Sequence, residues 1–71
     1  MKNIEFSEIL RHFLQVNQLT QTGFATKIGA KQSQVSEWLK GKAKPGYDSL
    51  REMALAFDLS PAYLLGLDDE F

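Results

Sequence analysis

The chain has 71 residues, a formal net charge of −1 and 44% hydrophobic residues, a composition typical of one small folded domain. It contains no cysteine and a single histidine, which excludes disulfides, thiolate chemistry and most zinc sites. No apolar stretch reaches the roughly 18 residues of a membrane span, and the opening MKNIEF lacks the apolar region of a signal peptide. We therefore expect a cytoplasmic protein without metal, cofactor or small-molecule ligand.

Residues 3–17 are predicted to form the first helix, because their apolar residues recur at the spacing of one helical face. That face consists of Phe6, Ile9, Leu10, Phe13 and Leu14. Asn3 can cap the N-terminus of this helix. The beginning of the chain is thus expected to supply one amphipathic helix to the core.

Two shorter helices are predicted over residues 21–28 and 32–40, joined by the three-residue turn 29–31. Thr20 is the expected N-cap of the first, and Gly29 ends it because glycine adopts a left-handed conformation at little cost. The residues expected to face inward are Phe24, Ala25, Ile28, Val35, Trp38 and Leu39. Two helices of this length around a glycine turn are typical of a helix-turn-helix motif.

The segment GKAKPG is predicted to be a loop, because its proline and glycines interrupt the helical pattern. A helix over residues 47–57 should follow, burying Leu50, Met53, Ala54 and Phe57. Ser60 and Pro61 then open a last helix over residues 61–65, with Leu64 and Leu65 inward. The predicted fold is all-α, a compact five-helix bundle over residues 1–66 with an acidic tail at 67–71.

Charge is distributed unevenly along the chain. The stretch from Lys27 to Lys44 carries a net charge of +4, whereas the remainder carries −5. The outward residues predicted for helix 32–40 are all polar, namely Gln32, Ser33, Ser36, Glu37 and Lys40. An α-helix fits the major groove of DNA, where each base pair presents a distinct pattern of donors and acceptors. The charge pattern alone is compatible with two interpretations, a face that binds a polyanion and an ordinary solvated surface.

The segment LTQTGFATKIGAKQSQVSEWLKG, residues 19–41, resembles the helix-turn-helix of the lambda repressor/Cro-like (Xre-type) transcriptional regulators. The following PGYDSLREMALAFDLSPAYLLG resembles the fourth and fifth helices of that family. The resemblance covers about residues 6–66 and implies the lambda repressor-like fold. It also implies that the protein binds double-stranded DNA with sequence specificity, as a regulator of phage or mobile-element type that acts as a repressor.

The resemblance assigns roles to individual residues. Gln32, Ser33 and Glu37 stand at base-reading positions of the recognition helix, and Gln21 stands where a glutamine rests on a backbone phosphate. Phosphate contacts are implied for Lys40, Lys42 and Lys44. Lys31 occupies the N-cap position of the recognition helix, where relatives carry Ser or Thr, so a cap is lost while a positive charge is added near DNA.

One recognition helix reads only a few base pairs, so we expect a homodimer on a palindromic operator. The surface expected to form it is the last helix with the tail, through Tyr63, Leu64, Leu67 and Phe71. The alternative is that Leu64 is wholly internal and that Phe71, at the end of the chain, is disordered. The alternative function is a protein-interaction module on the same fold, antitoxin-like or an adaptor, which the overall acidity favours. An enzyme is not expected, because the sequence offers no nucleophile–base pair and no phosphate-binding glycine loop.

Overall fold

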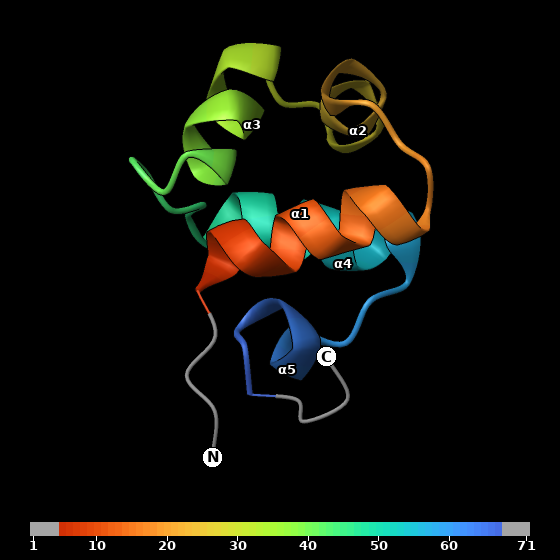
Figure 1. Cartoon of the computed structure of the whole chain (residues 1–71). Helices are drawn as coiled ribbons and strands as arrows, with labels where there is room; N and C mark the ends of the chain where they lie inside the picture. Colours follow the sequence, from red (N-terminus) through yellow and green to blue (C-terminus); the bar gives the residue numbers. More distant parts are fainter. Residues whose placement is uncertain (1–4, 68–71) are drawn as a thin grey trace.

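The computed structural model describes residues 5–67, which form five helices and no strand. Helices α1 and α4 lie in the middle of the molecule, with α2 and α3 on one side of them and α5 on the other (Figure 1). The helices are α1 (Phe6–Val16), α2 (Gln21–Ile28), α3 (Gln32–Leu39), α4 (Tyr47–Phe57) and α5 (Pro61–Leu64). The predicted all-α five-helix bundle is confirmed, and α2 and α4 have their predicted bounds.

Helix α2 begins and ends as its flanking residues predict. The Thr20 Oγ1 atom accepts a hydrogen bond from the Gly23 backbone N–H at 2.9 Å. Gly29 adopts a left-handed conformation with φ of 72°, and Ala30 donates its N–H to the Ala25 carbonyl oxygen at 2.9 Å. These two ends limit α2 to eight residues and hold the short turn that leads into α3.

Four other helix ends differ from the prediction. Helix α1 begins at Phe6 and not at residue 3, because Glu5 has an extended backbone and forms the N-cap; the expected cap, Asn3, lies outside the described residues. Helix α1 ends at Val16, α3 at Leu39 and α5 at Leu64, each one residue earlier than predicted. Left-handed glycines follow the ends of α3 and α5, Gly41 with φ of 75° and Gly66 with φ of 77°.

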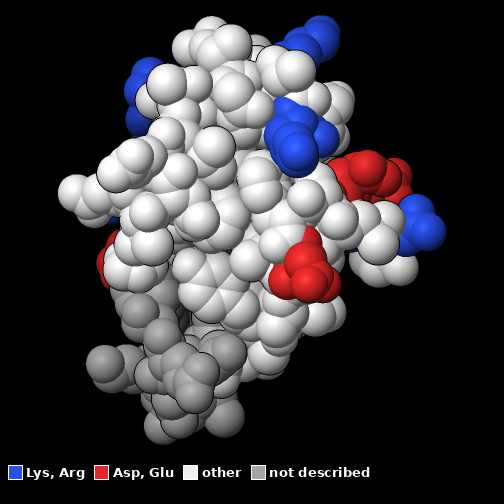
Figure 2. Space-filling view, turned by 90° about the vertical axis from the view of Figure 1, so that its right-hand side faces the viewer, with Lys and Arg blue, Asp and Glu red and all other residues white. Residues whose placement is uncertain are grey.

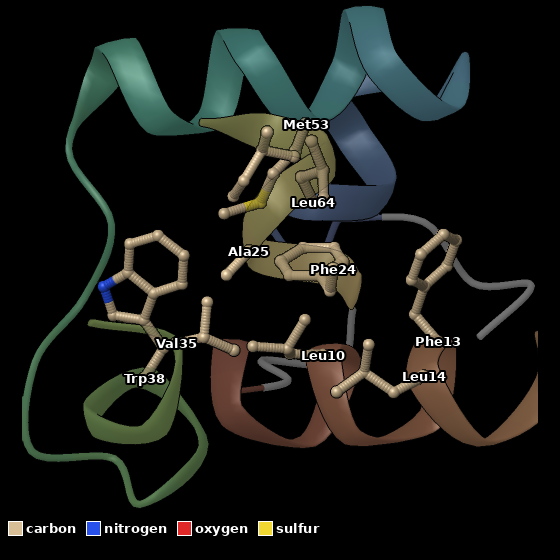
Figure 3. Close-up of a cluster of buried hydrophobic side chains, with 10 residues drawn as sticks. Leu10, Phe13, Leu14, Phe24, Ala25, Val35, Trp38, Met53 and Leu64 are labelled. Atoms are coloured by element: carbon tan, nitrogen blue, oxygen red, sulfur yellow. The ribbon is translucent and has the colours of Figure 1, made fainter. Parts of the chain in front are cut away.

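The core lies where α1, α2, α3 and α4 meet, and it is closed by α5 (Figure 3). Trp38 packs edge-on against Phe6, with ring centroids 6.2 Å apart, and Phe24 stacks on Phe57 at 5.3 Å. Among residues 5–67 no polar or charged residue is buried. The buried hydrophobic residues are Ile9, Leu10, Phe13, Leu14, Phe24, Ala25, Ile28, Val35, Trp38, Met53 and Leu64.

Several residues predicted to face inward are less covered than expected. Leu39, Leu50, Ala54 and Phe57 are half-buried and pack against the core from its edge. The prediction that Leu65 faces inward is wrong: its side chain is 57% exposed. The physical reason is the early end of α5, which places Leu65 at the C-cap, beyond the part of the helix that covers the core.

Candidate nucleic-acid interface

Helix α3 has two different sides. Val35 is fully buried and Trp38 nearly so, and Val35 lies between the Trp38 side chain and Leu10 of α1 (Figure 3). Gln32 and Ser33 are exposed on the first turn of the same helix. Helix α3 is therefore fixed by its inner residues, while the side chains at its start are free to meet a ligand.

The remaining predicted contact residues of α3 lie at different depths. Ser36 and Glu37 are half-buried, and Lys40 is exposed at the C-cap. No ion pair joins Glu37 to Lys40 or Lys42 within residues 5–67. The first turn thus presents more of its polar surface than the second, and Ser36 and Glu37 are less accessible than their outward position predicts.

The N-terminus of α3 is capped from within the helix. Lys31 makes no side-chain cap, as expected for lysine, but the Gln34 side-chain oxygen accepts a hydrogen bond from the Lys31 backbone N–H at 3.1 Å. This contact is the half of a capping box that a glutamine can supply. The Lys31 side chain is exposed, so its charge is available beside the first turn of α3.

The loop after α3 presents the predicted phosphate-binding lysines. Gly41 turns the chain in a left-handed conformation, and Lys42 donates its backbone N–H to the Glu37 carbonyl oxygen at 3.1 Å. Lys40, Lys42 and Lys44 are all exposed. Lys44 differs from the other two, because its Nζ lies 3.9 Å from Oε1 of Glu5 at the start of α1.

Gln21, at the first position of α2, is half-buried in a surface depression. Arg11, Gln15 and Leu39 line the same depression, so α1, α2 and the end of α3 meet there. Arg11 was not among the residues predicted to act at this surface. Nothing in the sequence pattern indicated it, because its partner, the Leu39 carbonyl, lies 28 positions away.

On one side of the molecule, the positively charged side chains gather mostly toward one end (Figure 2). Figure 2 shows one side of the molecule, on which most Lys and Arg atoms lie above the Asp and Glu atoms, toward the end that carries α2 and α3.

Within residues 5–67, no group of three or more potential metal ligands is found. No helix of the described part is long and apolar enough to cross a membrane.

The residues expected to form a dimer surface are partly unsuitable. Leu64 is only 6% exposed and belongs to the core, so its assignment to that surface is wrong. Tyr63 is half-buried against the core, and this burial raises the pKa of its hydroxyl. Leu67 is 54% exposed, but it does not share a helical face with Tyr63 because α5 ends at Leu64. Phe71 lies outside the described residues.

Comparison with known proteins adds an independent observation. A family model described as helix-turn-helix matches residues 14–64, from the second half of α1 to the last residue of α5. The chain belongs to the lambda repressor-like (Xre-type) helix-turn-helix family. This helix-turn-helix protein is a DNA-binding regulator, and its family is regulatory rather than enzymatic. No curated protein and no solved structure gives a significant match to the chain.

Proposed function

We propose that the protein is a sequence-specific repressor of phage or mobile-element type that reads the DNA major groove with α3. The observation that carries this proposal is the division of α3 between buried Val35 and Trp38 and exposed Gln32 and Ser33. A helix held rigidly by its inner side can present side chains to base edges at fixed positions.

The side chains at this surface have the chemistry that such a function needs. The Gln32 amide can form paired hydrogen bonds with adenine, Ser33 can bond to several bases, and Glu37 can accept from cytosine. Lys31, Lys40 and Lys42 can pair with phosphates, which fixes the register of the protein on the duplex without selecting a sequence. Gln21 is proposed to hold a further phosphate at the start of α2.

We also propose that the protein acts as a homodimer on a palindromic operator. One recognition helix contacts too few base pairs to select a site in a genome, and two such helices one DNA turn apart solve this problem. The dimer surface is proposed to include Tyr63 and the exposed Leu67, together with the residues that follow.

The experiment that tests this function is a selection of binding sites from random duplex DNA at a stated salt concentration. A short palindromic consensus is the expected result, since it reports both sequence reading and two-fold symmetry. Binding of the duplex pool without any consensus would contradict sequence-specific reading. A protein that binds no duplex at low salt would instead act as the alternative protein-interaction module.

A further inference from the structure

The Arg11 guanidinium is held against the recognition helix. Its Nη2 donates a hydrogen bond to the Leu39 carbonyl oxygen at 3.1 Å, which joins α1 to the end of α3. The last carbonyls of a helix carry partial negative charge, and α3 has no basic residue in its own last turn. Arg11 supplies a cation at this position from a different helix, and the bond fixes where its guanidinium lies.

The bond to Leu39 leaves most of the guanidinium available. An arginine side chain carries several N–H donors in a planar arrangement. Within residues 5–67, no carboxylate lies within ion-pair distance of Arg11, and its side chain is exposed. Among the described residues, Arg11 is therefore a cation that is oriented by one neighbour and not neutralised by another.

The surroundings of Arg11 suit an anion. Arg11 and Gln21 line the same depression, whose other lining residues include Leu14, Leu19 and Leu39. Apolar side chains offer no acid that would compete for the guanidinium. Arginine pairs with phosphate oxygens through two parallel hydrogen bonds, and a neighbouring glutamine amide can donate a third. Leu39 is followed directly by Lys40, so the lysine-bearing loop begins beside this depression.

We infer that Arg11 binds a backbone phosphate of duplex DNA together with Gln21, so that α1 takes part in the contact with DNA. This inference rests on the proposed function, because it names the ligand of a depression that borders the recognition helix. The Leu39 carbonyl orients the guanidinium, and the same bond ties the phosphate contact to the end of α3.

The test compares Arg11→Gln with Arg51→Gln, since the chain has these two arginines and each change removes one positive charge. Arg51 lies on α4 and faces the groove between α4 and α5, a different side of the molecule. Binding to a selected operator and to random duplex is measured over a range of salt concentrations. Arg11→Gln should flatten the slope of log K against log salt by about one and weaken both duplexes alike. Arg51→Gln should leave the slope unchanged.

An Arg11→Gln slope equal to that of Arg51→Gln would overturn the inference and leave Arg11 as a cap on α3. Thermal melting of each variant separates loss of folding from loss of contact. A second measurement uses the unaltered protein: on addition of duplex, the Nε–H NMR signal of Arg11 should shift while that of Arg51 stays in place. If neither signal shifts although the wild-type protein still binds duplex, the inference on Arg11 is contradicted and the proposed function is not. A wild-type protein that shows no salt-dependent duplex binding would overturn the proposed function as well.

Discussion

The Nζ atom of Lys44 lies 3.9 Å from Oε1 of Glu5, which links the loop after α3 to the residue that precedes α1. Both side chains are largely exposed, so the pair contributes little to folding. The pair should instead affect DNA binding, because Lys44 must separate from Glu5 before it can bind a phosphate.

The lysines of this loop are therefore expected to be unequal. Lys42→Ala should weaken binding to all duplexes and flatten the salt slope by about one, whereas Lys44→Ala should have a smaller effect. Glu5→Gln should raise duplex affinity by about two- to five-fold, since it releases Lys44 from an exposed ion pair. Binding isotherms at several salt concentrations check these values. Equal slopes for Lys42→Ala and Lys44→Ala, with no gain from Glu5→Gln, would show that the pair does not limit Lys44.

Replacement of Gln32 or Ser33 by alanine should reduce sequence preference more than overall affinity. Each well-formed base contact contributes roughly 1–3 kcal/mol of discrimination. The ratio of operator to random-duplex affinity is the quantity to measure, with Thr26→Ala, an exposed change on α2, as the control. Wild-type ratios for both α3 variants would remove these two residues from base reading.

Trp38→Ala should destabilise the fold by about 3–5 kcal/mol, because Trp38 is 4% exposed and packs against Phe6. A domain of 71 residues lies near the lower end of the usual range of stability, so most of the variant should be unfolded at room temperature. Circular dichroism during urea titration measures the loss. Tyr47→Ala removes an aromatic ring that is 78% exposed and should change stability little. A well-folded Trp38→Ala protein that fails to bind DNA would make Trp38 a contact residue.

Gly29→Ala should lower the free energy of unfolding by about 1–2 kcal/mol, because Gly29 has φ of 72° and an L-residue is strained there. The matched change is Gly46→Ala, at a φ of −81° where an added Cβ meets no atom within 4 Å. Gly46 is the N-cap of α4, so Gly46→Ala loses an N-cap glycine without backbone strain, and Gly29→Ala should cost more in chemical denaturation. Equal stabilities would contradict the role given to the left-handed turn.

The dimer proposal is tested by sedimentation of the intact chain and of a chain cut after Gly66, each with and without operator. The intact protein should bind as two protomers per palindrome, and the shortened chain should lose this pairing because Leu67 and the tail are absent. Saturation of the site by one protomer, or unchanged pairing of the shortened chain, would reject this surface.

The sequence predicted the helix-turn-helix well because the residues that begin and end α2 act locally. Thr20 and Gly29 act within a few residues of themselves, through a side-chain cap and a left-handed turn, so the bounds of α2 could be read directly. The prediction that Leu65 faces inward was wrong because the end of α5 was placed one residue too late. Ser60 and Pro61 mark where α5 begins, but its end depends on the left-handed Gly66, which closes the helix after four residues.

The contacts that the sequence did not reveal join distant positions. Arg11 with Leu39, and Glu5 with Lys44, are brought together by the packing of α1 against α3 and not by any local pattern. The partial burial of Ser36 and Glu37 likewise depends on neighbouring elements and not on a local sequence pattern. The base-reading and phosphate-binding roles of the interface residues stay predictions until the measurements above are made.

The two-sided nature of α3 also bears on how such a regulator diversifies. Val35 and Trp38 hold the helix, whereas Gln32 and Ser33 take no part in the core. Exchange of the exposed pair should therefore redirect the protein to a new operator without a new fold. Two copies of the gene that differ at these positions should then control separate promoters in one cell, because neither protein should bind the operator of the other.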